Sequence, residues 1–217
     1  MPASDDLALR QSIIDHCRQM NASGLNQGTS GNISVRAGTA MLITPSATPY
    51  EAMAPDMIAA MPLDGEGAWE GPLKPSTEWR FHRDILNARP EIGAIVHAHS
   101  PFATILAIAG KPIPACHYMI AAFGGPDIRL AAYATFGTQD LSAHVVDALD
   151  GRLGCLIANH GMIAIGPTLE RAMWLAVELE TLARQYYHAL LIGGPKLLSD
   201  AEIDRVRERF ADYGMKR

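Results

Sequence analysis

The sequence has few cysteines, no long apolar run and little net charge, and each absence excludes a class of protein. Its three cysteines, Cys17, Cys116 and Cys155, are widely spaced, which argues against a disulfide-stapled secreted domain and favours a reducing compartment. No apolar run approaches the roughly 18 residues that cross a bilayer. The formal net charge of −5 offers no basic face to nucleic acid. We expect a protein that binds neither membrane nor nucleic acid.

The N-terminal residues lack the basic and apolar regions of a signal peptide, so we expect a cytoplasmic location. The chain has 217 residues, of which 48% are apolar and 19% charged, an ordinary globular composition. This length suits one substantial domain and is short for two. We therefore expect residues 1–217 to form a single domain.

Apolar periodicity predicts interspersed helices and strands. The predicted helices cover 5–20, 76–88, 101–108, 138–149, 168–191 and the stretch from 200 onward; the predicted strands cover 33–36, 41–44, 91–99, 153–158 and 162–165. Ser76 is a suitable N-cap for the second helix. The stretch 110–137 is rich in Gly, Pro and Ala and gives no clear pattern. Because the strands at 33–44 form a hairpin, the sheet need not be parallel.

The strongest chemical signal is His97-Ala98-His99 at the end of an apolar strand. Residues i and i+2 of a strand share one face, so both imidazoles can bind the same metal ion. A third histidine, His160, lies between two predicted strands. Three imidazoles with an open fourth position are typical of a catalytic zinc site. The alternative for any histidine is a hydrogen-bonded core position, and this interpretation is assigned to four others: His16, His82, His144 and His188.

Three polar turns are candidates for binding an anion: residues 28–32, Thr44 to Ala47, and Ser76-Thr77 before a predicted helix. Clustered backbone N–H groups and helix N-termini both attract phosphate. No P-loop is present, so we do not expect a nucleotide phosphate. Glu78 follows the third turn. It is either an acid that interacts with the helix dipole, or a base and switchable metal ligand, and spacing alone does not choose between them.

Together these motifs resemble the zinc-dependent class II aldolase/adducin family, and the resemblance spans the whole chain. The segments that carry it are 24–36, 42–45, 75–82, 96–99, 117–122, 133–138, 159–161 and 213–214. The resemblance implies a three-layer α/β/α domain with a largely antiparallel central sheet. It also implies a homotetramer whose active sites lie at subunit interfaces.

The resemblance assigns roles to individual residues. One zinc ion per subunit is bound by three histidines and, in the resting enzyme, a glutamate that becomes the catalytic acid/base: His97, His99, His160 and Glu78. The phosphate pocket is formed by Gly31, Asn32, Ser46, Ala47, Ser76 and Thr77. Aromatic residues serve the aldehyde end: Tyr118, which reaches a neighbouring subunit's site as a second catalytic residue, Phe136 and Tyr213. Ser46-Ala47 replaces the usual Thr-Gly, and we expect Ala47 to offer its N–H with a negative φ.

The implied activity is reversible cleavage of a ketose 1-phosphate to dihydroxyacetone phosphate and an aldehyde. The ketose is of the L-fuculose, 5-deoxyribulose or 5-methylthioribulose type. The alternatives are a pentulose 5-phosphate 4-epimerase or a sugar-acid phosphate decarboxylase of the same family, and a non-catalytic adducin-like scaffold module. Scaffold modules lose the histidine ligands, whereas this chain keeps all three.

Overall fold

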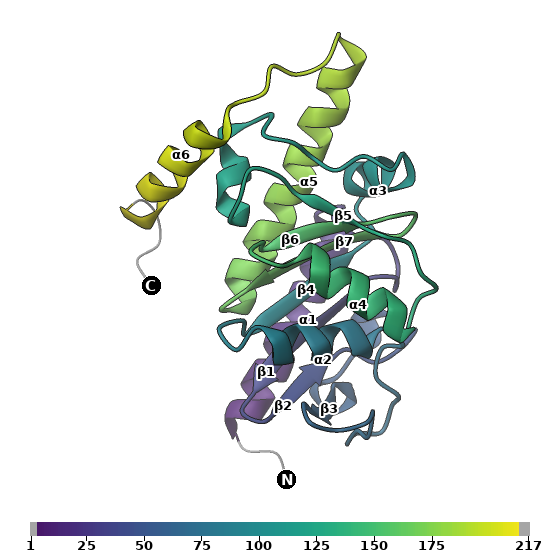
Figure 1. The fold of residues 1–217 in the computed structure, drawn as a ribbon. Coiled ribbons are helices and arrows are strands. Elements are labelled where there is room, and N and C mark those ends of the chain that lie inside the picture. Colours follow the sequence, from purple (N-terminus) through teal and green to yellow (C-terminus); the bar gives the residue numbers. More distant parts are fainter. Residues whose placement is uncertain (1–3, 213–217) are drawn as a thin grey trace.

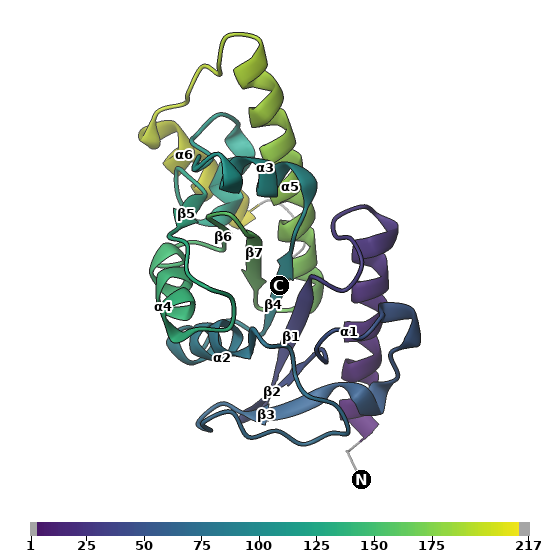
Figure 2. The ribbon, with the colours of Figure 1, turned by 90° about the vertical axis from the view of Figure 1, so that its right-hand side faces the viewer.

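The computed structural model describes residues 4–212 and contains one seven-stranded sheet with helices on both faces (Figures 1 and 2). The strands are β1 (Asn32–Ala37), β2 (Ala40–Ile43), β3 (Ala59–Pro62), β4 (Ala94–Ala98), β5 (Arg129–Ala131), β6 (Gly154–Ile157) and β7 (Gly161–Gly166). Their order across the sheet is β3-β2-β1-β4-β7-β6-β5. Every neighbouring pair is antiparallel except β5 and β6, which are parallel. This confirms the expected mixed architecture with a largely antiparallel sheet.

The helices form the two outer layers. They are α1 (Ser4–Ala22), α2 (Trp79–Ala88), α3 (Pro101–Ile108), α4 (Gln139–Ala148), α5 (Leu169–Leu191) and α6 (Asp200–Asp212), with 3-10 helices at Tyr50–Ala52, Pro55–Met57 and Tyr118–Phe123. In Figure 2, α2 and α4 lie on one side of the sheet, and α1 and α5 lie on the other. Two apolar clusters fill the two interfaces between helices and sheet. Helix α6 packs instead against the 3-10 helix at Tyr118–Phe123.

Strand β4 shows how alternation divides the core. Ala94 and Val96 belong to the cluster under α1 and α5, whereas Ile95 belongs to the cluster under α2 and α4. His97 continues the register of Ile95, and its ring lies edge-on to Phe81 of α2, with the ring centroids 5.5 Å apart. The β4 histidine therefore projects toward the α2 layer, as the period of two residues requires.

The beginning of α2 differs from the prediction. The helix begins at Trp79, with Glu78 rather than Ser76 at the position before it. The reason is that the preceding segment runs beside the end of β2: the Ser76 N–H donates to the Thr44 carbonyl, and the Ser46 N–H donates to the Lys74 carbonyl, both at 2.9 Å. Backbone pairing with this neighbouring segment thus holds Ser76 extended, and the helix can begin only after it.

Strand β3 was not predicted, because its sequence Ala-Ala-Met-Pro lacks the β-branched and aromatic residues that mark strands. Its position at the edge of the sheet, paired with β2, depends on contacts that local sequence does not encode. No helix in the described part of the chain is long and apolar enough to cross a membrane.

Candidate metal centre

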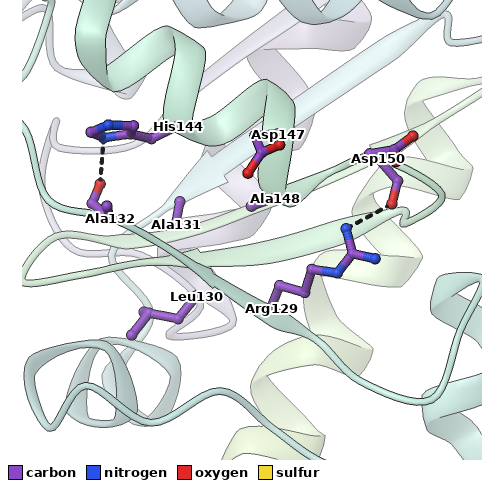
Figure 3. Close-up of a pocket in the computed structure, with 8 residues that line it drawn as sticks. All are labelled: Arg129, Leu130, Ala131, Ala132, His144, Asp147, Ala148 and Asp150. Carbon is purple, nitrogen blue, oxygen red and sulfur yellow. Dashed lines mark hydrogen bonds between the residues drawn. The ribbon is translucent and has the colours of Figure 1, made fainter.

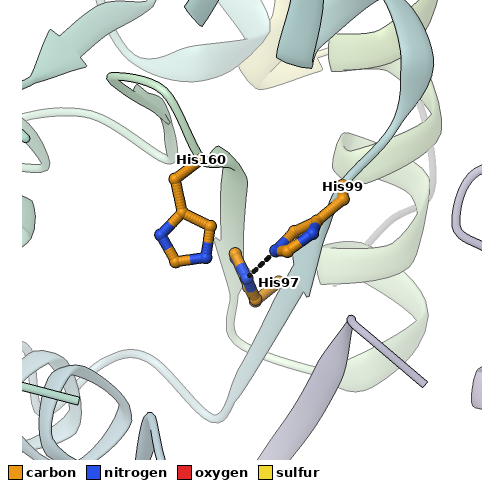
Figure 4. A group of neighbouring side chains, drawn as sticks. All are labelled: His97, His99 and His160. Atoms are coloured by element: carbon orange, nitrogen blue, oxygen red, sulfur yellow. Dashed lines mark hydrogen bonds between the residues drawn. The ribbon is translucent and has the colours of Figure 1, made fainter. Parts of the chain in front are cut away.

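Three histidines from two segments of the chain meet at one point (Figure 4). His97 lies within β4, His99 directly follows it, and His160 lies in the tight turn between β6 and β7. One ring nitrogen from each lies within 4.8 Å of the other two. The Nε2 atoms of His97 and His99 are 3.1 Å apart, close to the roughly 3.3 Å that separates ligands on a tetrahedral zinc ion with bonds of about 2.0–2.1 Å.

Backbone geometry brings His160 to the pair. Strands β4 and β7 are register partners, with Ala98 opposite Met162. Asn159 adopts a left-handed conformation with φ 55, which asparagine tolerates better than most residues. Gly161 follows, and a Cβ there would lie 2.6 Å from the Ala98 carbonyl oxygen and 2.9 Å from the His99 ring. Glycine at this position permits the close approach that brings His160 beside His99.

Hydrogen bonding sets the protonation of His97. Its Nδ1 lies 2.9 Å from the carbonyl oxygen of Met162, which can only accept, so Nδ1 carries the proton. The Nε2 atom is then the ring nitrogen available to bind a metal ion, and it faces the other two imidazoles. This pattern, in which one ring nitrogen donates to a backbone carbonyl while the other faces the centre, is typical of metal-binding histidines.

Glu78 closes the centre from the side of α2. Its Oε2 lies 3.2 Å from His97 Nε2, and its Oε1 lies 3.2 Å from His160 Nε2. Oε2 accepts a hydrogen bond from Asn32 Nδ2 at 2.9 Å, whereas the buried Oε1 has no hydrogen-bond partner. The carboxylate oxygen that lacks a hydrogen bond and the three imidazole nitrogens together form a set of ligands suited to a divalent cation. The residues present therefore fit a metal ion.

The pKa values of Glu78, His99 and His160 favour the protonation states in which these side chains can bind a metal ion. Burial alone would raise the pKa of Glu78, but the interactions of its carboxyl with His97 and His160 and the Asn32 hydrogen bond outweigh it, so the pKa lies well below its ordinary value. Burial, followed by the electrostatic interaction with His97, lowers the pKa of His99 and of His160 to about 4. At neutral pH the carboxyl is ionised and these two imidazoles are neutral, as metal binding requires.

The centre opens into a cavity of about 330 Å³, lined by Ser30, Thr77, Glu78, His99, Tyr133, Ala134, Phe136, Asn159 and His160. Tyr133 and Phe136 are 59% and 63% exposed, and with Ala134 they give the cavity an apolar wall. Phe136 was predicted at this end of the site, whereas Tyr133 was not. Tyr118 is 49% exposed on its 3-10 helix, packs on His117, and does not line the cavity. Tyr213 lies outside the described residues.

The predicted phosphate turns lie beside one another at the end of β1 and β2. Thr44 N–H donates to the Ile33 carbonyl at 3.1 Å, and Ser76 N–H donates in turn to the Thr44 carbonyl. Thr77 and Ser30, which directly precedes Gly31, line the cavity. Ser76 Oγ accepts a hydrogen bond from the Glu78 N–H at 3.3 Å, so this turn and the carboxylate form one unit.

The structure differs from expectation at one residue of the predicted phosphate pocket. Ala47 has φ 49 rather than a negative value, so it occupies a conformation that favours glycine. Gly31 is buried beneath the turn, where a Cβ would meet the His97 carbonyl oxygen at 2.8 Å. Asn32 is also buried, and both polar atoms of its side chain are bonded to protein groups, Glu78 and His82.

Asn26 is a site residue that the sequence analysis missed. Its Oδ1 accepts from the His99 N–H at 3.2 Å and from Ser30 Oγ at 3.1 Å, and its amide donates to the Tyr50 hydroxyl at 3.3 Å. Asn26 therefore fastens the loop that carries Ser30 to the backbone of a candidate ligand. An asparagine inside a turn-rich segment gives no signal of such contacts, since His99 and Tyr50 lie 73 and 24 residues away in the sequence.

A second cavity, of about 460 Å³, lies between β5 and α4 (Figure 3). None of the predicted site residues lines it. Two side chains that line it bond to backbone: Arg129 donates to the Asp150 carbonyl at 2.9 Å, and His144 Nδ1 donates to the Ala132 carbonyl at 3.2 Å. The three candidate metal ligands lie instead at the histidine centre.

Comparison with known proteins agrees with this site. Residues 11–187 match the family model described as Class II Aldolase and Adducin N-terminal domain. The chain is 55% identical over 214 residues to a 5-methylthioribulose-1-phosphate/5-deoxyribulose-1-phosphate aldolase from Rhodospirillum rubrum, covering 99% of this chain and 96% of that protein. It is 48% identical over 209 residues to an L-fuculose phosphate aldolase from Escherichia coli, covering 96% of both. A solved structure of L-fuculose 1-phosphate aldolase superimposes with a TM-score of 0.91 at 37% identity, covering 97% of this chain and 98% of that one.

Proposed function

The chain belongs to the class II aldolase and adducin family, and from that premise we propose that it is a zinc-dependent aldolase of ketose 1-phosphates. It cleaves its substrate reversibly to dihydroxyacetone phosphate and an aldehyde. One observation carries the proposal: three imidazoles and a buried carboxylate face one another at a cavity with an aromatic wall. The similar proteins bear the names of aldolases that act on such substrates, which supports the substrate class.

We assign one zinc ion per subunit to His97, His99 and His160, with Glu78 as the fourth ligand before substrate binds. A metal ion held there supplies a Lewis acid that stabilises the negative charge developing on the ketose oxygens. Neutral imidazoles suit this role, because they leave the charge of the cation undiminished. The low pKa values of His99 and His160, about 4 in both cases, support their neutral state at physiological pH.

Glu78 moves the proton of the reacting carbon. In the direction of aldol addition, its carboxylate removes a proton from the hydroxymethyl carbon of dihydroxyacetone phosphate and leaves an enediolate. In the direction of cleavage, it returns the proton to that carbon. The lowered pKa of Glu78 supports an ionised carboxyl at neutral pH, and Oε1 is the oxygen without a hydrogen bond.

The polar turns hold the phosphate, a part of the substrate that does not react. Binding there orients the reacting carbons against Glu78 and lowers the entropic cost of the reaction. The residues assigned are Gly31, Asn32, Ser46, Ala47, Ser76 and Thr77. The direct hydrogen bond between Ser76 Oγ and the Glu78 N–H supports coupling between the phosphate turn and the proton-transfer group.

The aldehyde half lies toward the aromatic wall. Phe136 lines the cavity and is largely exposed, which suits an aldehyde with an apolar end. Tyr118 is exposed and does not line the cavity of its own chain, which supports a role in the active site of a neighbouring subunit. There it would accept the C4 hydroxyl proton of the ketose during cleavage. Tyr213 is assigned to the same end. The assignment of Tyr118 requires an oligomer, which we propose is a homotetramer with active sites at subunit interfaces.

The cellular setting follows from the same chemistry. We propose that residues 1–217 act as a single domain in the cytoplasm. The three cysteines are unpaired, and Cys17 and Cys155 are fully buried in the apolar core, which suits a reducing compartment.

The test measures dihydroxyacetone phosphate release from L-fuculose 1-phosphate and 5-deoxyribulose 1-phosphate side by side. We expect release from at least one, and the ratio of kcat/KM identifies the aldehyde half. Glu78→Gln should keep zinc and lose about 10²–10⁴-fold in kcat, whereas Glu180→Gln, which alters a carboxylate that caps α3, should retain wild-type rates. No release from either ketose by the zinc-loaded protein would overturn the proposal.

A further inference from the structure

A chain of three buried side chains leads from the core to the carboxylate of Glu78. Ser34 of β1 and His82 of α2 are fully buried, and Asn32 is nearly so. Ser34 Oγ lies 2.7 Å from His82 Nδ1. The other ring nitrogen of His82 is bonded to Asn32 Oδ1, and Asn32 Nδ2 is bonded to Glu78 Oε2.

The acceptors in this chain fix the direction of every hydrogen bond. The ionised Glu78 oxygen can only accept, so the Asn32 amide nitrogen faces it and the amide oxygen faces His82. Because that oxygen can only accept, His82 Nε2 carries the ring proton. Burial lowers the pKa of His82 to about 3, so the ring is neutral and its Nδ1 accepts from Ser34. Each side chain therefore donates to the next: Ser34 to His82, His82 to Asn32, and Asn32 to Glu78.

The chain distinguishes the two oxygens of the carboxylate. Oε2 is held by Asn32, whereas Oε1 is buried without a donor. An amide that could rotate by half a turn would place its oxygen against the carboxylate and repel it. His82 prevents that rotation, and its ring is itself held by stacking on Phe81, with the ring centroids 4.7 Å apart.

We infer that His82, braced by Ser34, is a positioning residue that locks the Asn32 amide so that Glu78 is anchored through Oε2 and moves its proton through Oε1. The inference deepens the proposed aldolase function and rests on it for the proton transfer, whereas the hydrogen-bond chain itself stands on the geometry. It gives the Asn32 side chain a task other than contact with the phosphate. Its consequence is an effect on turnover without an effect on substrate binding.

The kinetic test compares His82→Leu, His82→Gln and the control Asp84→Asn in the zinc-loaded enzyme. His82→Leu removes the donor to Asn32, so kcat should fall about 10–100-fold, the scale of a displaced catalytic group, with KM changed by less than about twofold. Glutamine can present an N–H near the position of Nε2, so His82→Gln should recover kcat to within about fivefold of wild type. Asp84→Asn alters the carboxylate that accepts hydrogen bonds from Gln139 and Ser142, two residues after His82 in the same helix. This control should leave kcat unchanged.

A second arm is independent of activity. In zinc-loaded protein labelled with 15N-histidine, we expect His82 to give the spectrum of a neutral ring protonated at Nε2, and Ser34→Ala should shift its Nδ1 resonance. Zinc should remain at one ion per chain in every variant. A ring protonated at Nδ1, an Nδ1 resonance unmoved in Ser34→Ala, or His82→Leu with wild-type kcat would overturn the inference. An inactive wild type with the expected spectrum would instead overturn the aldolase proposal and leave the hydrogen-bond chain standing.

Discussion

The glycine after His160 offers the sharpest test of how the backbone builds the metal centre. Gly161 opens β7 beside the end of β4, and its φ is not positive. An alanine there is therefore disfavoured by steric overlap with its neighbours rather than by its backbone conformation. Its Cβ would lie 2.6 Å from the Ala98 carbonyl oxygen and 2.9 Å from the His99 ring. Both neighbours must move, and one of them belongs to a candidate ligand.

The expected cost follows from that overlap. Overpacking against backbone costs about 1–3 kcal/mol, and at this chain length each kcal/mol lowers the Tm by about 2–4 °C. We expect metal-free Gly161→Ala to melt about 2–12 °C below wild type. Because His99 is displaced, zinc affinity should fall as well, by about 10–100-fold, the loss typical of disturbed ligand orientation.

The assay is thermal unfolding of the metal-free protein, followed by zinc titration against a chromophoric chelator. The matched control is Gly65→Ala, where φ is also not positive and a Cβ would meet its nearest atom, in Pro62, at an ordinary 3.4 Å. Gly65→Ala should behave as wild type in both measurements. Wild-type stability and zinc affinity in Gly161→Ala would refute the claim that close approach of β4 and β7 sets the ligand geometry.

Three further outcomes follow from the structure. The pKa of His82 is about 3 when folded against an unfolded value near 6.5, so the folded state binds fewer protons in that range. His82 alone should therefore lower the stability of the metal-free protein by about 1.4 kcal/mol per pH unit on acidification below pH 6.5, on top of the loss from His99 and His160. Urea unfolding of wild type and His82→Gln at several pH values checks this, because the variant should have the shallower slope, and equal slopes would contradict it. Ala47→Gly relieves a left-handed conformation and should stabilise by up to about 1 kcal/mol, seen as a higher Tm; a lower Tm would count against the positive φ. Arg36→Met removes the guanidinium donor from the carbonyls of Leu86, Arg89 and Ile92, of which Arg89 keeps a bond from the Ile92 N–H. The change should lower the free energy of unfolding in urea by about 2 kcal/mol, and an unchanged midpoint would show that these bonds add no net stability.

Local patterns predicted the parts of the site that depend on one strand or one hairpin. The pairing of His97 and His99 on one face follows from strand alternation, and it holds because β4 is bonded on both sides, by β1 and β7. Helix α3 is observed over Pro101–Ile108, as predicted, since a proline follows its N-cap residue. The hairpin of β1 and β2 is likewise as predicted.

What the sequence did not predict depends on contacts between distant segments. His82 was assigned to a hydrogen-bonded core position, and its burial agrees, but its partners Ser34 and Asn32 lie 48 and 50 residues away. The start of α2 and the positive φ of Ala47 arise where the segment before the helix pairs with the end of β2. Side-chain patterns along a single element carry no information about such pairing.

We propose that a metal ion bound by His97, His99 and His160 makes this chain an active aldolase. The most direct measurement removes metal from the wild-type protein with EDTA, returns Zn²⁺ in steps, and follows zinc content and dihydroxyacetone phosphate release together. We predict no release without metal and a linear rise that ends at one zinc ion per chain. The same rise should be absent in His97→Ala. Full activity in metal-free protein, or zinc bound stoichiometrically without release from either ketose phosphate, would contradict the account.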